Sequence, residues 1–197
     1  MPSILEILGV ATGILGVYLT ILRTPLCWIV ASVNVIIYGY IFFEAKLYAD
    51  MALQFVFLVC SVYGWFLWTH SSNSFKADDS PLYVQRSTIS ELMIGMIITI
   101  PIAIMVGMGL SHYTDADVPY IDAVLASVSI WGQILQTKKR IEHWYVWMFV
   151  DASYICVYAM KDLYLSSMLY FIFLIMAIQG ARVWNSTLRF AAKNLTQ

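Results

Sequence analysis

One carboxylate interrupts a long apolar stretch of the sequence. Asp151 lies seven residues beyond Trp144, about 10 Å of helix rise, and the stretch 144–160 contains no Lys or Arg. A charge near the centre of a membrane helix costs about 2.5–3.5 kcal/mol on insertion scales, so it requires a partner or a function. Asp151 can contact a cationic substrate or ion, or it can pair with a polar group on a neighbouring helix or stay protonated. Acids nearer helix ends, where we expect solvated or capping roles, are Asp50, Glu91 and Asp122.

Amide and aromatic side chains fall in other apolar stretches. The deep amides are Asn34, Gln54, Gln133 and Gln179. Such an amide can bond a ligand, or it can join two helices with a hydrogen bond worth about 1 kcal/mol. The aromatic residues within the stretches are Tyr38, Trp131, Tyr154, Tyr158 and Tyr170. Aromatic faces attract cations by about 0.5–2 kcal/mol and stack on flat heterocycles, although core packing explains any single ring equally well.

The sequence contains no catalytic motif. It lacks G-x-x-x-x-G-K-[ST], G-x-S-x-G and H-E-x-x-H, and its three histidines are isolated near helix ends. Cys27, Cys60 and Cys156 lie in apolar stretches without the spacing of a zinc site, so we interpret them as packing residues. We therefore expect no enzyme, no cofactor and no metal. Without an ATP site, any transport must be driven by a gradient or by trapping of the substrate.

The composition places these residues in a membrane. Of 197 residues, 61% are hydrophobic and 12% are charged, with a mean hydropathy of +0.76 and a net charge of −1. Soluble domains carry about 25% charged residues, and nucleic-acid binding would require an excess of positive charge. At about 20 residues per span, the chain accommodates about seven transmembrane helices. The apolar segments are Ile4–Leu22, Trp28–Phe43, Tyr48–Thr69, Ile89–Leu110, Pro119–Thr137, Trp144–Met160 and Tyr164–Asn185.

The basic residues predict the orientation of the chain. One set of loops, together with the C-terminal end, holds Arg23, Lys76, Arg86, Lys138, Lys139, Arg140, Arg182, Arg189 and Lys193. The opposite loops hold only Lys46 and Lys161. The positive-inside rule therefore places the N-terminus outside and the C-terminus in the cytoplasm. The tryptophans expected toward the inner side, as in an interfacial aromatic belt, are Trp28, Trp65, Trp68, Trp144, Trp147 and Trp184.

The chain also repeats itself at an offset of 116 residues. The offset pairs Trp28 with Trp144, Tyr38 with Tyr154, Gly64 with Gly180, and Trp68 with Trp184. It brings Asn34 within one position of Asp151. We therefore expect an all-α integral membrane protein with seven transmembrane helices in a 3+1+3 arrangement of parallel repeats, as in SWEET-type transporters, which bind substrate between the repeats. The single membrane domain, 1–197, divides into a first repeat (4–69), a linker helix (87–110) and a second repeat (119–185).

Several runs of sequence resemble the Pnu family of vitamin transporters. They are F-F-E-A-K-L-Y-A-D-M-A-L-Q (42–54), Y-G-W-F-L-W (63–68), T-K-K-R-I-E-H-W (137–144), W-M-F-V-D-A-S-Y (147–154) and K-D-L-Y-L-S-S-M-L-Y (161–170), with Gly180 and Trp184. The resemblance covers nearly the whole chain. It implies a fold similar to enlarged SWEET proteins, a location in the bacterial cytoplasmic membrane, and facilitated diffusion of a small vitamin. A cytoplasmic kinase would trap the vitamin by phosphorylation without any required contact.

The resemblance leaves two vitamins, since members of the family take up nicotinamide riboside or, in another branch, thiamine. Both are flat cationic heterocycles with hydroxyl groups. Two departures favour thiamine. The chain starts directly at its first core helix, without the N-terminal extension of many riboside carriers, and Trp131 stands where those carriers tend to have a small residue. Nicotinamide riboside is the alternative.

We expect the cationic ring to lie between Trp131 and one or more of Tyr38, Tyr154 and Tyr158, with Asp151 supplying charge. The amides would bond its polar edges. The repeats would rock about this site, with close helix approach or bending at Gly39, Gly64, Gly132 and Gly180. Other interpretations are a SWEET-type sugar carrier, a membrane module that binds without transporting, and proton coupling through Asp151. A homo-oligomer is compatible with the sequence.

Overall fold

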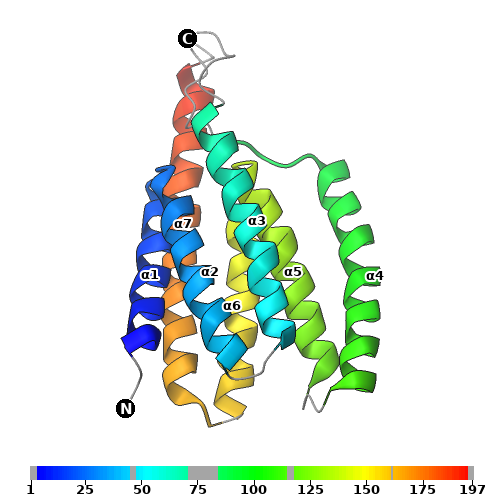
Figure 1. Ribbon diagram of the computed structural model, residues 1–197. Coiled ribbons are helices and arrows are strands. Elements are labelled where there is room, and N and C mark those ends of the chain that lie inside the picture. Colours follow the sequence, from blue (N-terminus) through cyan, green and yellow to red (C-terminus); the bar gives the residue numbers. More distant parts are fainter. Residues whose placement is uncertain (1–3, 45–47, 71–83, 115–117, 161, 195–197) are drawn as a thin grey trace.

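The structure is all-helical, as predicted. The computed structural model describes residues 4–44, 48–70, 84–114, 118–160 and 162–194, and within these ranges the chain forms seven helices (Figure 1). They are α1 (Ile4–Ile21), α2 (Leu26–Glu44), α3 (Tyr48–His70), α4 (Ile89–Tyr113), α5 (Pro119–Thr137), α6 (Glu142–Met160) and α7 (Tyr164–Asn194). The bounds agree with the predicted segments to within a few residues, except that α7 continues past Asn185.

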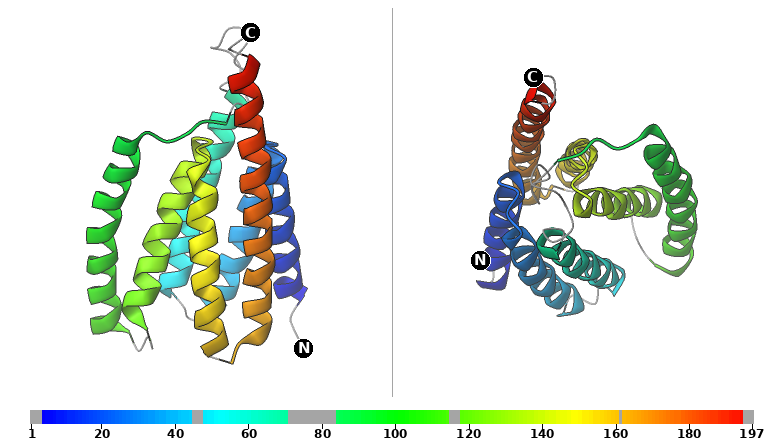
Figure 2. Two further views of the ribbon diagram at one scale, coloured as in Figure 1. Left: turned by 180° about the vertical axis from the view of Figure 1, so that it is seen from behind. Right: turned by 90° about the horizontal axis from the view of Figure 1, so that it is seen from above.

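Six of these helices form a closed ring, and α4 lies outside it. Around the ring, α1 contacts α2, α2 contacts α3, α3 contacts α5, α5 contacts α6, α6 contacts α7, and α7 contacts α1. Among the described helices, α4 packs on α5 alone. The view from above shows α4 set apart on the far side of α5 (Figure 2). The ring therefore brings helices from both ends of the chain together around one interior.

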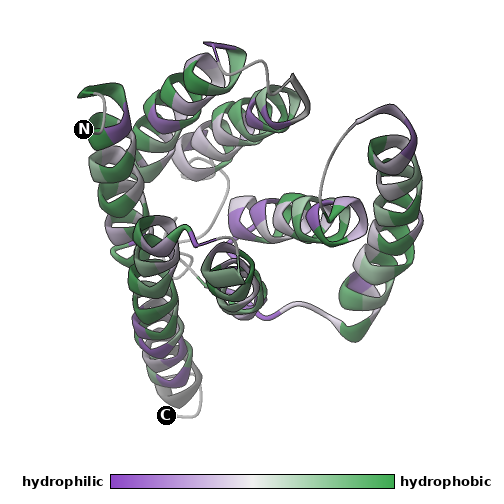
Figure 3. Cartoon of the chain, turned by 90° about the horizontal axis from the view of Figure 1, so that it is seen from below, coloured by the Kyte–Doolittle hydropathy of each residue, from purple (hydrophilic) through white to green (hydrophobic). Residues whose placement is uncertain are grey.

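The helices have the apolar surfaces of a multi-pass membrane protein. Within the described residues, five helices are long and apolar enough to cross a membrane, namely α1, α2, α3, α4 and α7. Hydrophobic residues predominate along α4 in the view from below (Figure 3). The less apolar α5 contacts three other helices, and it buries Ser127, Ser129 and Gln133. A helix surrounded by protein needs fewer apolar residues, because less of its surface faces lipid.

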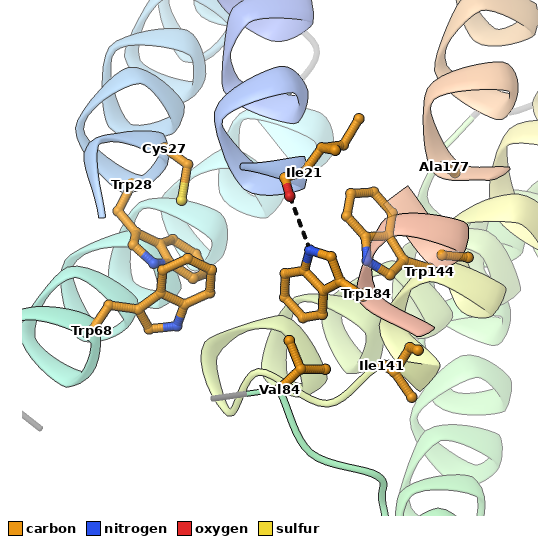
Figure 4. Close-up of a cluster of buried hydrophobic side chains, with 10 residues drawn as sticks. Ile21, Cys27, Trp28, Trp68, Val84, Ile141, Trp144, Ala177 and Trp184 are labelled. Carbon is orange, nitrogen blue, oxygen red and sulfur yellow. Dashed lines mark hydrogen bonds between the residues drawn. The ribbon is translucent and has the colours of Figure 1, made fainter. Parts of the chain in front are cut away.

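Four tryptophans form a buried layer at the end of the ring where α1, α3, α5 and α7 approach their C-termini. This tryptophan layer consists of Trp28, Trp68, Trp144 and Trp184, each at most 2% exposed (Figure 4). The predicted interfacial belt is therefore wrong for these four residues, which pack against one another instead of facing the membrane surface. Edge-to-face stacking, which favours perpendicular rings, joins them in two pairs, and a tilted contact of Trp68 with Trp184 at 6.4 Å links the pairs. Trp28 meets Trp68 at 5.4 Å and Trp144 meets Trp184 at 5.6 Å, both at 90°.

The 116-residue offset recurs in the contacts of this layer. We call two residues 116 positions apart counterparts. The Trp68 indole donates to the Thr137 carbonyl at 3.0 Å, and its counterpart Trp184 donates to the carbonyl of Ile21, the counterpart of Thr137, at 3.2 Å. Each bond joins α3 or α7 to the C-terminus of α5 or α1. The two halves of the chain thus hold each other by equivalent hydrogen bonds.

The turns beside the layer are also equivalent. Arg23, after α1, and its counterpart Lys139, after α5, have left-handed φ angles of 60° and 53°. Each turn is closed by equivalent backbone bonds, for example Arg23 N–H to Thr20 at 2.9 Å and Lys139 N–H to Gln136 at 3.0 Å. The positive φ lets the chain reverse sharply into the next helix. Two stretches with different side chains therefore make the same turn.

Glycines allow the closest helix contacts, as predicted at three of four positions. A Cβ on Gly64 would lie 2.5 Å from the Trp28 ring, and one on its counterpart Gly180 would overlap the Trp144 ring. A Cβ on Gly132 would lie 2.9 Å from Val146. At Gly39 a Cβ would make only an ordinary contact. The tryptophan layer thus depends on two glycines that let large rings approach the backbone of α3 and α7.

The start of α4 is anchored to the turn between α5 and α6. Thr88 caps the helix by accepting from the Glu91 N–H, and Glu91 accepts from the Thr88 N–H in return. Glu91 also forms an ion pair with Arg140 at 2.9 Å. The capping role expected for Glu91 is confirmed, and the ion pair attaches α4 to the second half of the chain.

Candidate functional site

A cavity of about 470 Å³ lies inside the ring. All six ring helices contribute to its walls, whereas none of its lining residues comes from the described part of α4. Its volume falls within the range of about 300–1,000 Å³ that is typical of small-molecule sites. The ring therefore encloses a space suited to a small molecule.

The walls of the cavity come largely from counterparts. In eight counterpart pairs, both residues line the cavity. The pairs are Val17 and Gln133, Thr20 and Gln136, Ala31 and Trp147, Val35 and Asp151, Phe42 and Tyr158, Gln54 and Tyr170, Phe57 and Phe173, and Ser61 and Ala177. The cavity thus lies where the two halves of the chain face each other. In three of these pairs, Val17 and Gln133, Val35 and Asp151, and Ser61 and Ala177, an apolar residue is matched by a polar one, so the two halves repeat the backbone frame without repeating its polarity. Such a space suits a ligand whose two sides differ.

Asp151 lines this cavity near the middle of α6. It is 5% exposed, and within the described residues its carboxylate has no hydrogen-bond or ion-pair partner. An uncompensated buried carboxylate is costly, and a cation in the cavity would offset that cost. Among the described residues, no three His, Cys, Asp or Glu side chains gather in a way that could hold a metal ion.

Asn34 projects toward the same space from α2. Its amide nitrogen donates to the Gly9 carbonyl at 2.7 Å and to the Thr12 hydroxyl at 2.9 Å. These two bonds to α1 orient the side chain, and its carbonyl oxygen can accept from a ligand. Gln54 and Gln133 line the cavity from α3 and α5. Three of the four predicted amides are therefore brought together.

The aromatic residues divide into two groups. Tyr38 lines the cavity beside Phe42, with ring centroids 6.0 Å apart. Tyr158 and Tyr170 line it from α6 and α7, 5.3 Å apart. Tyr154 does not line it but stacks behind them, 4.8 Å from Tyr170 and 5.6 Å from Tyr158. Tyr154, Tyr158 and Tyr170 thus form one connected cluster, in which Tyr154 supports the two rings on the cavity wall, and Tyr38 forms a separate pair with Phe42.

Two predicted residues lie away from the cavity. The Trp131 ring packs directly on Gly95 of α4, where an added Cβ would overlap it. It fills the contact between α4 and α5, and the expectation that it stacks on a ligand does not match this position. Gln179 is exposed on α7. Both point away because a helix turns 100° per residue, so similar depth along a helix does not imply a common face.

Other lining residues escaped the sequence analysis. Trp147 on α6 donates to the Gln136 amide oxygen at 3.3 Å, and both residues line the cavity. Ser61, Thr12 and Phe173 also line it. The repeat contains a usable signal for one of them, because Ser61 is the polar member of a counterpart pair whose other residue is Ala177. A small hydroxyl side chain in an apolar helix does not by itself indicate a binding site.

A buried lysine lies beside the tryptophan layer. Lys139, in the turn between α5 and α6, is 8% exposed and places its ammonium 4.9 Å from the centre of the Trp68 ring. Burial lowers the pKa of this ammonium to about 8, only partly opposed by the nearby Cys27 sulfur. The cation–π contact joins the second half of the chain to α3 of the first.

Comparisons with known proteins agree on one family. The model of the nicotinamide mononucleotide transporter family matches residues 3–186. Curated relatives include the nicotinamide riboside transporter PnuC of Escherichia coli (strain K12) and that of Shigella flexneri. Each is 25% identical to this chain over 208 residues, which cover 95% of this chain and 87% of the relative.

A solved structure shares the fold. The crystal structure of the vitamin B3 transporter PnuC is similar to this chain with a TM-score of 0.73 and 20% identity. The similarity covers 95% of this chain and 83% of that protein. Nearly the whole ring, together with α4, is therefore an architecture that a known transporter also has.

Proposed function

Because the chain belongs to the nicotinamide mononucleotide transporter family, the Pnu family of the sequence analysis, we propose that it carries nicotinamide riboside into the cell. The chain is a multi-pass protein of the bacterial cytoplasmic membrane and a vitamin transporter of the PnuC type. The choice of vitamin follows the curated relatives, which are named for nicotinamide riboside.

Asp151 is the observation that carries the proposal. Nicotinamide riboside is a flat cation with a hydroxylated sugar, and the cavity combines a buried carboxylate with tyrosine faces and amide groups. A carboxylate and aromatic faces attract a cation, and amides bond hydroxyl and carboxamide groups. A neutral sugar, the ligand of a SWEET-type carrier, would leave Asp151 without a counter-charge.

Thiamine, the vitamin favoured by the sequence analysis, is not carried forward. One of the two departures behind that preference was Trp131 as a wall of the site, but Trp131 packs on Gly95 outside the cavity. The curated relatives are named for the alternative, nicotinamide riboside. Thiamine therefore becomes the competing outcome of the binding test.

The proposed architecture is two parallel three-helix repeats joined by α4. The closed ring, the equivalent turns at Arg23 and Lys139, and the equivalent indole bonds of Trp68 and Trp184 support it. The distribution of basic residues supports an external N-terminus and a cytoplasmic C-terminus. The tryptophan layer then closes the cytoplasmic end of the cavity.

In the proposed mechanism, the two repeats rock about the bound vitamin. Transport is facilitated diffusion, and a cytoplasmic kinase makes uptake directional by phosphorylating the vitamin after release. Separation of the repeats at the tryptophan layer opens the cavity to the cytoplasm. Asp151 serves as a fixed counter-charge for the substrate, so transport does not require a proton gradient.

A binding titration tests the choice of vitamin. The purified protein is titrated with nicotinamide riboside and with thiamine while tryptophan fluorescence or heat is followed. We expect saturable binding of the riboside and much weaker binding of thiamine. Tight binding of thiamine alone would replace the substrate, and absence of binding by either would overturn the proposed cation site.

A further inference from the structure

Ser61 is a buried hydroxyl on the cavity wall. It lies on α3, its side chain is 0% exposed, and within the described residues its oxygen has no hydrogen-bond partner. It lines the cavity. A buried hydroxyl without a partner loses its bonds to water and gains nothing in return. A ligand in the cavity is the natural source of the missing bond.

Three other helical hydroxyls of the described chain behave differently. Ser32 and Ser153 donate to the carbonyl one turn earlier at 2.8 Å, and Thr20 does so at 2.9 Å. This local bond satisfies a serine or threonine in an apolar helix. Ser61 makes no such bond among the residues described, so its hydroxyl keeps an unused donor and acceptor at the cavity wall.

The repeat shows that the fold does not need this hydroxyl. The counterpart of Ser61 is Ala177, which is 1% exposed and also lines the cavity. An equivalent position in an equivalent helix is thus filled by a methyl group. Packing alone would be satisfied by alanine at both positions, and the extra oxygen at Ser61 calls for a different explanation.

Ser61 lies deeper in the cavity than Asp151. Gly64 meets Trp28, and Ser61 is three residues, about 4.5 Å, from Gly64 toward the outer end. Asp151 is seven residues, about 10 Å, from Trp144, the counterpart of Trp28. Ser61 is therefore about 6 Å further toward the tryptophan layer. A riboside whose cationic ring lies near Asp151 can reach this depth with its sugar.

A second unpartnered donor lies at the same end. The Trp144 indole nitrogen is buried and, within the described residues, has no acceptor, and Trp144 lines the cavity. Trp28, its counterpart, also leaves its N–H without an acceptor but does not line the cavity. The Trp144 donor alone would therefore not indicate a ligand, and Ser61 carries the inference.

We infer that Ser61 contacts the substrate, and that its hydroxyl forms a hydrogen bond with a sugar hydroxyl of the riboside at the inner end of the cavity. This inference rests on the proposed function, because it requires a ligand with a hydroxylated sugar. Ser61 is then a specificity-determining residue that distinguishes the riboside from the free cationic ring.

The test replaces Ser61 with the residue found at its counterpart. The variants are Ser61→Ala and Ser61→Cys, the second of which leaves the side-chain volume nearly unchanged. Each is titrated with nicotinamide riboside and with 1-methylnicotinamide, which keeps the cationic ring but lacks the sugar. Ser32→Ala is the matched control, since that hydroxyl is bonded to Trp28 and does not line the cavity. Melting temperatures are measured for all variants.

We expect Ser61→Ala to weaken riboside binding by about five- to tenfold, as for one lost neutral hydrogen bond. Its melting temperature should not fall, and its affinity for 1-methylnicotinamide should match that of the wild type. Unchanged riboside affinity, or an equal loss for both ligands, would overturn the assignment of Ser61 to the sugar. Failure of the wild-type protein to bind the riboside would instead overturn the proposed function.

Discussion

Asp151 and the tyrosines near it form the charged and aromatic part of the cavity. The carboxylate is buried without a partner among the described residues, and Tyr158 and Tyr170 line the same cavity. Electrostatic attraction is stronger where water is excluded. A permanent cation, which cannot lose its charge by giving up a proton, suits this environment better than an amine does.

Asp151→Asn should weaken binding of nicotinamide riboside by about 10- to 100-fold, because it removes a charge-assisted interaction and keeps the shape of the side chain. The melting temperature of the ligand-free protein should hold or rise, because an uncompensated buried charge is removed. The titration described above measures both effects.

Asp162→Asn is the matched control for this change. Asp162 is exposed in the turn before α7, where it accepts from the Tyr164 hydroxyl at 2.8 Å. It lies outside the cavity wall, so its substitution should leave affinity unchanged. If Asp151→Asn binds the riboside as tightly as the wild type, Asp151 is not the counter-charge.

Sequence reasoning located Asp151, Asn34 and Gln54 on the cavity wall because apolar stretches make polar residues conspicuous. It misplaced Trp131 and Gln179 for a geometric reason. Hydropathy reports how deep a residue lies along a helix, whereas its direction around the axis depends on which helices are neighbours. The sequence does not say which helices are neighbours. For example, it does not show that α5 packs against α3, α4 and α6 at once.

At the scale of helices, contacts between glycines and tryptophans determine how closely α3 and α7 approach their neighbours. Gly64→Ala should lower stability by about 1–3 kcal/mol, because the new Cβ would lie 2.5 Å from the rigid Trp28 ring. Thermal unfolding in detergent measures the change.

Gly109→Ala in α4 is the matched control, because a Cβ at Gly109 meets nothing within 4 Å. Alanine favours a helix over glycine by about 1 kcal/mol, so the control should be neutral or stabilising. Equal losses in the two variants would show that helix propensity, and not contact with Trp28, decides the outcome.

The turn between α5 and α6 should make stability depend on pH. The pKa of Lys139 is about 8 in the folded protein, against about 10.4 for an unperturbed lysine. Between these values the unfolded chain binds more protons, so stability should rise with pH from about 8 to 10.4 and be lower below pH 8.

Lys139→Met removes this titrating group. In thermal unfolding, the stability of the wild type should rise between about pH 8 and 10.4, and the variant should lack this rise. Parallel curves for the two proteins would contradict the burial of a charged Lys139.

At the scale of the whole molecule, the ring places the cavity between two halves that the tryptophan layer ties together. The Trp68 and Trp184 indoles donate to Thr137 and Ile21, so each bond crosses from one half of the chain to the other. For the cavity to open past this layer, both bonds must break. Cys27, which is 1% exposed and packs in one buried cluster with the layer, reports on such opening.

Trp68→Phe combined with Trp184→Phe should accelerate labelling of Cys27 by about 10-fold, because two indole donors are lost while the rings remain. The measurement uses a membrane-impermeant maleimide on inside-out vesicles, with Cys60 and Cys156 replaced by alanine. Trp131→Phe, in the contact between α4 and α5, is the control away from the layer. Labelling at the wild-type rate would show that these bonds do not hold the layer closed.

The helices themselves were predictable to within a few residues, since a bilayer requires continuous apolar segments of a given length. The extension of α7 to Asn194 was not predictable, because the residues after Asn185 no longer form a continuous apolar segment. Hydropathy also cannot predict that six helices close into a ring, because it does not report which helices are neighbours. The 116-residue repeat supplied the best available guide to it, through Trp28 and Gly64.

Counterflow in proteoliposomes tests the central proposal most directly. Vesicles loaded with unlabelled nicotinamide riboside are diluted into a trace of labelled riboside, with and without a pH gradient. We predict transient accumulation of label that is the same under both conditions and is lost in Asp151→Asn. Absence of accumulation despite binding would contradict transport and indicate a binding module, and accumulation only with a pH gradient would contradict facilitated diffusion.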